Sequence, residues 1–180
     1  SFWKRNFKNL GKWSWDLHRM MSLTNIFLKL FFSILFLILF CANCFSKTVE
    51  VGMWSDFQSK KNNMQYDPRI ISINVGDTVF WKSLGKDHNV EFIVEGIPVG
   101  VEKLNSELNQ DVEFTFITPG IYAYVCTLHI NIGMIGFVVV GNDLHNLKEV
   151  KKIKYSSFAR RIAKELIEEI EKAYGDWLIF

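Results

Sequence analysis

Apolar and polar residues alternate along several short segments between about residue 47 and residue 141. The segment 70–75 places isoleucine and valine at every second position, and the segment 112–117 does the same with valine and phenylalanine. This spacing turns one face of a strand toward a core and the other toward solvent. The pattern therefore predicts a domain of short, half-buried β-strands.

Residues that favour turns separate these segments. A Gly-Asp pair precedes one expected strand, and a Thr-Pro-Gly turn precedes another. Many short strands broken by Gly, Pro and Asp are typical of a sandwich or barrel. The segment 95–110 lacks the alternation, and we expect a loop with one helical turn there. The expected strands cover residues 48–54, 70–75, 78–81, 88–94, 112–117, 121–126 and 136–140.

The spacing of apolar residues changes after Gly141. Asn142 or Asp143 is expected to cap a short helix that ends near Val150. A longer helix is predicted from about residue 156 to residue 173, because apolar residues recur there at four-residue spacing. We expect this apolar stripe to pack on the strands, and a helix that binds a partner or a membrane surface is the alternative. The stripe comprises Phe158, Ile162, Leu166, Ile170 and Tyr174.

Residues 26–42 are almost wholly apolar, with a lysine near their start. Their uninterrupted part is shorter than the roughly 20 residues that a membrane-spanning helix needs. It fits the apolar region of a secretory signal, which runs about 7–15 residues. We expect residues 21–46 to be a signal peptide cleaved before Phe45 or Lys47, and an uncleaved membrane anchor is the alternative.

The residues before Met21 form a short basic stretch without helical or strand periodicity. We interpret residues 1–20 as sequence read from upstream of a start at Met21, and a native N-terminal extension is the alternative. The expected organisation is thus an upstream extension, a signal peptide, a sandwich and a helical tail packed on it. The last two cover residues 47–141 and 142–180.

Charge argues against nucleic-acid binding. The formal net charge is +2, of which residues 1–46 contribute +5 and the remainder −3. A nucleic-acid-binding domain needs a basic surface, whereas the expected strand domain is acidic. The sequence also shows neither a Ser/His/Asp arrangement nor paired catalytic carboxylates, so hydrolytic enzymes are not indicated.

Cys126 is the one cysteine outside the expected signal peptide. Cys41 and Cys44 lie in the segment that we expect to be removed. A lone thiol in an exported domain cannot form an internal disulfide. A buried structural cysteine, intermolecular pairing and metal ligation are the explanations that remain open.

Cys126 also begins a run, C-x2-H-x4-M, that places three metal-binding side chains within nine residues. Soft sulfur suits Cu(I), and imidazole suits both oxidation states of copper. Two histidines, one cysteine and a weakly bound methionine therefore make an electron-transfer site with no open position for a substrate. An upstream histidine supplies the second imidazole. The predicted metal ligands are His88, Cys126, His129 and Met134.

These residues occur in motifs that resemble the cupredoxins, a family of blue-copper proteins. The chain has Gly-Asp-x-Val-x-Trp at residues 76–81, His-Asn-Val at residues 88–90, the copper loop and a final strand at residues 136–140. Plastocyanins and pseudoazurins share the loop spacing, but a tail with two expected helices is typical of pseudoazurins. The resemblance implies a mainly β, Greek-key cupredoxin sandwich with two C-terminal α-helices and one type 1 copper ion.

The resemblance also implies a function and a location. A pseudoazurin is a soluble, monomeric electron carrier of the periplasm and not an enzyme. Its partners are redox proteins such as a nitrite or nitrous oxide reductase or a cytochrome c, without nucleic acid or a small-molecule substrate. A periplasmic copper-binding or chaperone protein and a membrane-anchored cupredoxin of the plastocyanin type are the alternatives.

Several neighbours of the ligands gain expected roles from the resemblance. Asn89 is expected to hydrogen-bond across to the Cys126 loop, as residues that support metal ligands do. Leu128 stands where the family usually has proline, which restores a backbone N–H and frees φ. His129 is the expected port for electrons, with Lys86 near the docking surface. Apolar neighbours that could surround the port are Ile130, Ile132 and Met134, whereas Ile135 is assigned to the core.

Overall fold

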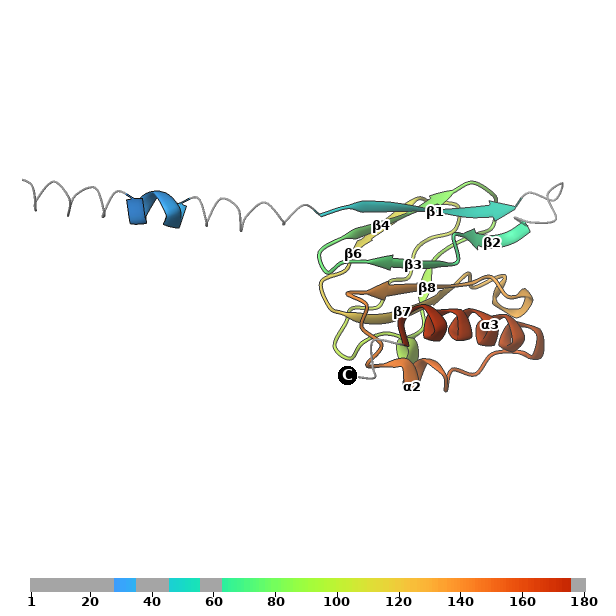
Figure 1. Ribbon diagram of the computed structural model, residues 1–180. Coiled ribbons are helices and arrows are strands. Elements are labelled where there is room, and N and C mark those ends of the chain that lie inside the picture. Colours follow the sequence, from blue (N-terminus) through green and yellow to red (C-terminus); the bar gives the residue numbers. More distant parts are fainter. Residues whose placement is uncertain (1–27, 35–45, 56–62, 176–180) are drawn as a thin grey trace, which may run out of the picture. The chain divides into compact units, whose positions relative to one another are not determined.

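The computed structural model describes residues 28–34, 46–55 and 63–175 (Figure 1). The chain divides into two units, residues 1–45 and residues 46–180. In the first unit the described residues are helical and exposed. The rest of the expected signal peptide and the expected upstream extension lie outside the described residues. Among the residues that are described, no helix is both long and apolar enough to cross a membrane.

The second unit contains two four-stranded sheets (Figure 1). The first sheet has the order β2 (Asn63–Asp67), β1 (Thr48–Ser55), β4 (Thr78–Ser83) and β6 (Val112–Thr115). The second has the order β3 (Ile70–Ile73), β8 (Ile135–Val140), β7 (Gly120–Val125) and β5 (Glu91–Phe92). In the first sheet β1 pairs in parallel with β4, while the β1–β2 and β4–β6 pairs are antiparallel. In the second sheet β3 pairs in parallel with β8, while β7 pairs antiparallel with both β8 and β5.

The second sheet is covered on both of its faces. Along β7, Tyr122 and Tyr124 point into the core between the sheets, whereas Ile121, Ala123 and Val125 belong to a second core beneath the helices. All residues of β7 and β8 are buried. A strand covered on both faces carries apolar side chains at successive positions, which explains why these two segments are continuous apolar runs.

Two α-helices, α2 (Leu147–Val150) and α3 (Ser157–Tyr174), follow the last strand. Together with the sheets, they confirm the mainly β sandwich with C-terminal helices. The predicted stripe of α3 is partly wrong, because Phe158 is exposed. The helix instead turns small residues toward the sheet at its start, which lets the two backbones approach closely. Its buried residues are Ala159, Ala163, Leu166, Ile167 and Ile170.

Other boundaries also differ from the sequence prediction. The strand expected at residues 88–94 is reduced to β5, because His88 and Val90 hydrogen-bond to the segment 106–109 instead of to a long ladder. Short 3₁₀ helices lie at Val94–Gly96 (η1) and Ile130–Ile132 (η2). The first tail helix begins after Asn146, whose side chain bonds to the backbone N–H and C=O of Ile121. It therefore fixes the tail to β7.

Candidate metal centre

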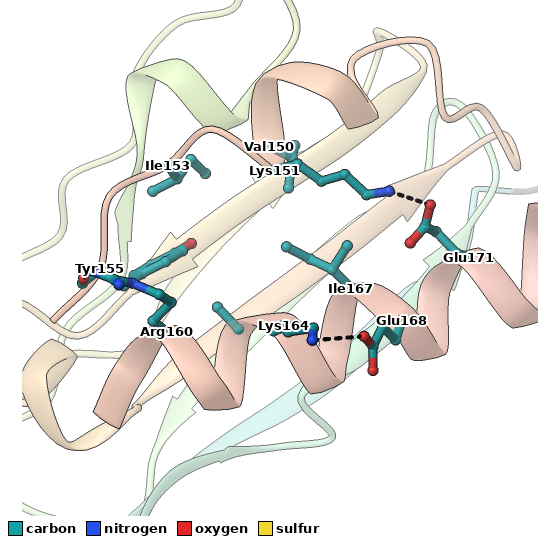
Figure 2. Close-up of a pocket in the computed structure, with 10 residues that line it drawn as sticks. Val150, Lys151, Ile153, Tyr155, Arg160, Lys164, Ile167, Glu168 and Glu171 are labelled. Atoms are coloured by element: carbon teal, nitrogen blue, oxygen red, sulfur yellow. Dashed lines mark hydrogen bonds and ion pairs between the residues drawn. The ribbon is translucent and has the colours of Figure 1, made fainter. Parts of the chain in front are cut away.

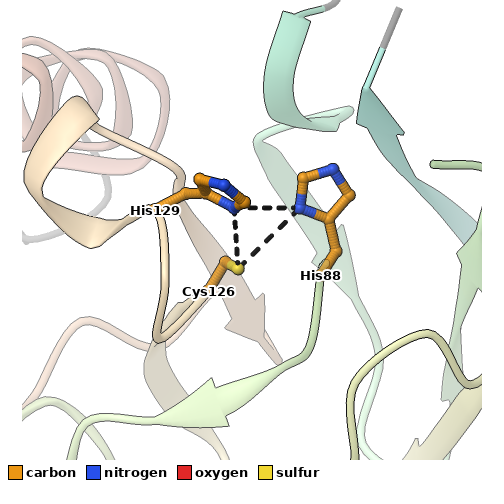
Figure 3. A group of neighbouring side chains, drawn as sticks. All are labelled: His88, Cys126 and His129. Atoms are coloured by element: carbon orange, nitrogen blue, oxygen red, sulfur yellow. Dashed lines mark hydrogen bonds between the residues drawn. The ribbon is translucent and has the colours of Figure 1, made fainter. Parts of the chain in front are cut away.

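Three of the four predicted ligands converge at one end of the sandwich (Figure 3). The Nδ1 atoms of His88 and His129 are 3.2 Å apart. The Cys126 Sγ lies 3.3 Å from Nδ1 of His129 and 3.8 Å from Nδ1 of His88. A point in the plane of these donors is about 2.0 Å from each, within the roughly 2.0–2.3 Å of metal bonds to imidazole and thiolate. The triangle therefore has the size that a bound metal ion requires.

Strand pairing sets the position of Cys126. The ladder between β7 and β8 ends at the pair Val125 and Ile135, and one more bond joins the Cys126 N–H to the Met134 carbonyl at 3.2 Å. The Met134 N–H in turn donates to the His129 carbonyl at 3.1 Å. The loop from Cys126 to Met134 is thus closed by its own backbone, which holds His129 beside the thiol.

Met134 is fully buried and belongs to the same core cluster as Cys126. Its backbone bond to Cys126 places it at the end of the loop nearest the thiol. A thioether is a weak, soft ligand that suits the long axial bond of a copper site. The assignment of Met134 as the fourth ligand stays a prediction.

His88 is fully buried, and both of its ring nitrogens face polar atoms. While Nδ1 faces the thiol, Nε2 lies 2.5 Å from the Ser55 hydroxyl, which donates to the Lys86 carbonyl at 3.1 Å. Burial lowers the pKa of His88, and the neighbouring His129 lowers it further. Both effects favour the neutral imidazole, the form that binds a metal. Ser55 could not be recognised from the sequence, because its hydroxyl comes from a strand 33 residues away from His88.

Asn89 makes the cross-link expected of it. Its side-chain oxygen accepts from the Thr127 N–H at 2.9 Å and from the Thr127 hydroxyl at 3.1 Å. Its amide nitrogen donates to the Ser106 carbonyl at 3.3 Å. The prediction that Asn89 ties the His88 segment to the Cys126 loop is confirmed.

Arg69 is a further support that sequence reasoning missed. Its guanidinium donates to the Gly133 carbonyl at 2.5 Å, and Gly133 directly precedes Met134. Burial lowers the pKa of Arg69, although nearby Glu165 opposes this effect. Gly133 itself has φ +87°, and a Cβ there would lie 2.9 Å from the side chain of Ile162. Arg69 and α3 therefore hold the end of the copper loop from two sides.

The surface beside the site differs in part from the expected one. Ile132 is 52% exposed, but Met134 is buried, so including Met134 in the apolar surface was wrong. Leu128, for which no docking role was predicted, is 57% exposed. His129 is half-buried and Lys86 is exposed. The apolar surface around His129 therefore includes Leu128 and Ile132.

A groove of about 330 Å³ lies between α2, α3 and the segment joining them (Figure 2). None of its lining residues is a histidine or cysteine. Rim charges pair with one another, as in Lys164 with Glu168 at 3.6 Å and Lys151 with Glu171. The groove thus lacks the imidazole and thiol donors of the ligand triangle, and none of its lining residues belongs to that triangle.

Comparisons with known proteins agree with this geometry. Residues 54–141 match the family described as copper binding proteins, plastocyanin/azurin family. The pseudoazurin of Paracoccus pantotrophus is 36% identical over 125 residues, which cover 69% of this chain and 85% of that protein.

Solved pseudoazurin structures share the fold. That of Methylobacterium extorquens AM1 has a TM-score of 0.64 and 27% identity, and the match covers 68% of this chain and 98% of that one. That of Hyphomicrobium denitrificans has a TM-score of 0.62 and 28% identity, and the match covers 68% of this chain and 97% of that one. With a His/Cys/His triangle of metal-binding size at the end of this fold, the chain belongs to the pseudoazurins, copper-binding proteins of the plastocyanin/azurin family.

Proposed function

We propose that the protein is a periplasmic electron carrier that holds one type 1 copper ion. The proposed ligands are His88, Cys126 and His129, with Met134 as a weak fourth ligand. The observation that carries the proposal is the triangle of two imidazole nitrogens and a thiol, with sides of 3.2, 3.3 and 3.8 Å. Copper bound there would supply one-electron exchange between Cu(I) and Cu(II).

The residues around the triangle favour electron transfer over catalysis. Asn89 and Arg69 fix the loop on either side of the thiol, so the ligands change position little when the charge changes. Cys126 and His88 are fully buried, which keeps water and substrates away from them. His129 alone of the three reaches toward the surface, and it is the proposed route for electrons.

The location and partners are part of the same proposal. Residues 21–46 act as a signal peptide, and the mature sandwich with its tail works as a soluble monomer in the periplasm. The similarity to pseudoazurins supports the proposed periplasmic location. The proposed partner is a redox protein, either a copper-containing reductase for nitrite or nitrous oxide or a cytochrome c.

A copper chaperone is the rival function. A chaperone must release its ion, whereas a carrier must keep the ion through repeated oxidation and reduction. The buried thiol and the closed loop favour retention. Repeated electrochemical cycling should leave the copper content at one ion per chain, and loss of copper on reduction would contradict the carrier function.

The proposed location has its own test. Mass spectrometry of protein recovered from the periplasm should find an N-terminus at Lys47 or Phe45. Recovery of the intact chain in the membrane fraction would instead support an anchored cupredoxin.

A further inference from the structure

The groove between α2 and α3 is apolar on both of its sides. Val150 of α2 and Ile153 of the linking segment line one side, and Ala163 and Ile167 of α3 line the other (Figure 2). An apolar cavity of about 150 Å³ is large enough to hold a benzene ring, and the groove has about 330 Å³. It therefore has room for two large apolar side chains.

A buried hydroxyl in this groove has no partner. Tyr155 lines the groove and is only 6% exposed, and its hydroxyl makes no hydrogen bond to any of the described residues. Figure 2 shows the Tyr155 ring extending from the segment between the helices toward the middle of the groove. Leaving a buried polar group unpaired is unfavourable. An occupant of the groove should therefore offer a hydrogen-bonding group as well as apolar side chains.

An apolar segment follows α3 directly. Residues 176–180 have the sequence Asp-Trp-Leu-Ile-Phe and lie outside the described residues. Four consecutive large apolar side chains are avoided on a protein surface unless they have a function. This segment therefore needs a surface that covers it, and the groove needs an occupant.

The end of α3 directs the chain to the groove side of the helix. The α3 residues that line the groove lie on one helix face, and this face continues to Tyr174 and Gly175 at three- and four-residue spacing. A Cβ at Gly175 would meet no atom of the described residues within 4 Å, which leaves space there for the chain to turn. The α3 residues that line the groove are Arg160, Ala163, Lys164, Ile167, Glu168 and Glu171.

The segment after Gly175 is also long enough to enter the groove. An extended chain spans about 3.3 Å per residue, so residues 177–180 can cover about 13 Å. A helix rises about 1.5 Å per residue, so Ile167 lies about 12 Å back along α3 from Gly175. After a turn beside Gly175, the four apolar residues can therefore run antiparallel to α3 as far as Ile167.

We infer that residues 177–180 turn back after α3 and bind in the groove as an extended segment of the same chain. Two of its side chains, at alternate positions, fill the space between α2 and α3, because alternate side chains of an extended segment share a face. A backbone carbonyl of the segment accepts a hydrogen bond from the Tyr155 hydroxyl. The bound segment connects the two tail helices, and this contact does not depend on the copper site.

Truncation tests the contribution of the segment to stability. A variant that ends at Gly175 should unfold about 5 °C below the full chain, because its apolar groove is left open. Phe158→Ser is the control, since it removes an apolar side chain that is 51% exposed and does not line the groove. It should shift the midpoint much less. Equal midpoints for the truncated and the full chain would overturn the inference.

Two double variants test the alternate arrangement of the side chains. One is Trp177→Ser/Ile179→Ser, and the other is Leu178→Ser/Phe180→Ser. One pair should lower the unfolding midpoint nearly as far as the truncation does, and the other pair should lower it much less. Equal shifts from both pairs would contradict an extended segment with one face in the groove.

The proposed hydrogen bond is tested with and without the segment. Tyr155→Phe should lower the unfolding midpoint by about 2–4 °C in the full chain. It should leave the midpoint of the variant that ends at Gly175 unchanged, because that variant lacks the acceptor. The same shift in both chains would refute the bond between the Tyr155 hydroxyl and the segment.

Dye binding shows whether the groove is open in the full chain. The apolar anion 8-anilinonaphthalene-1-sulfonate, which fluoresces at exposed apolar surface, should give severalfold stronger emission with the truncated variant than with the full chain. Equal emission from both proteins would show a groove that is open to small apolar molecules, and this result would overturn the inference.

NMR of the full chain identifies the occupant directly and does not require a variant that folds. The metal-free and Cu(I) forms are both diamagnetic, and in either form nuclear Overhauser effects should connect the ring of Trp177 or Phe180 with the methyl groups of Val150 and Ile167. In an equal mixture of labelled and unlabelled protein, these contacts should stay within one chain. Contacts between labelled and unlabelled chains would assign the groove to a second copy, and the absence of any contact would leave it without the segment. Either result would overturn the inference.

Discussion

Asn89→Ala should destabilise the metal-free protein by about 2–3 kcal/mol. The change removes the acceptor of the Thr127 N–H at 2.9 Å and of the Thr127 hydroxyl at 3.1 Å. It also removes the longer bond to the Ser106 carbonyl at 3.3 Å. A lost hydrogen bond costs about 0.5–1.5 kcal/mol, and a buried group left without a partner costs about 1–3 kcal/mol. Thr127 is an exposed residue, so water can replace part of its lost hydrogen bonding. The loss of unfolding free energy is therefore well below the sum of the separate hydrogen-bond terms.

Equilibrium unfolding in urea measures this change. With a slope of about 1–3 kcal/mol per M, the midpoint should fall by about 1–2 M. Thr127→Val is the matched control, because it removes only the hydroxyl bond and should cost about 1 kcal/mol or less. An Asn89→Ala midpoint equal to that of wild type would refute the cross-link as a source of stability.

Three further changes follow from the contacts around the loop and the tail. Gly133→Ala should cost about 1–3 kcal/mol of unfolding free energy, because the residue has φ +87° and its new Cβ would lie 2.9 Å from Ile162. Arg69→Met should cost about 1.5–3 kcal/mol in thermal unfolding, because the charged donor to the Gly133 carbonyl is lost. Tyr155→Phe should make stability less dependent on pH above about 10 in urea unfolding at several pH values, because burial raises the pKa of Tyr155 and only the unfolded chain loses that proton there.

Each of these changes has an outcome that contradicts its reasoning. Wild-type stability of Gly133→Ala would show that Ile162 does not restrict the loop. For Arg69→Met, the control is Arg161→Met at an exposed position. An equal loss of thermal stability in both variants would argue against a stabilising role for the bond from Arg69 to the Gly133 carbonyl. A wild type whose stability stays constant above pH 10 would show that Tyr155 and the other buried tyrosines ionise without unfolding.

The alternation of residues predicted most of the strands but not their limits. The segment of β2 (NMQYD) has few apolar residues, and its place in the sheet depends on pairing with β1. The strand expected at residues 88–94 is mostly irregular, since its hydrogen bonds go to a loop about 16 residues further along the chain. Pairing between distant segments decided both cases, and a local pattern does not contain that information.

The proposed metal ligands were easier to recognise in the sequence than the residues that support them. The short spacing between Cys126, His129 and Met134 is visible in the sequence, because one loop carries all three. Ser55 and Arg69 act from 33 and 64 residues away from their partners, and neither residue type signals a metal site. The exposed position of Phe158 was also missed, because the four-residue spacing does not fix which side of α3 meets the sheet.

Titration of the metal-free protein with Cu(II), followed by visible absorption, tests the copper site most directly. Wild type should bind one copper ion per chain and become intensely coloured, through charge transfer between the Cys126 sulfur and Cu(II). Cys126→Ser should fold but stay colourless, and Met134→Leu should keep both copper and colour, because the axial bond is weak. A colourless wild type loaded with copper, or a coloured Cys126→Ser, would contradict the assignment.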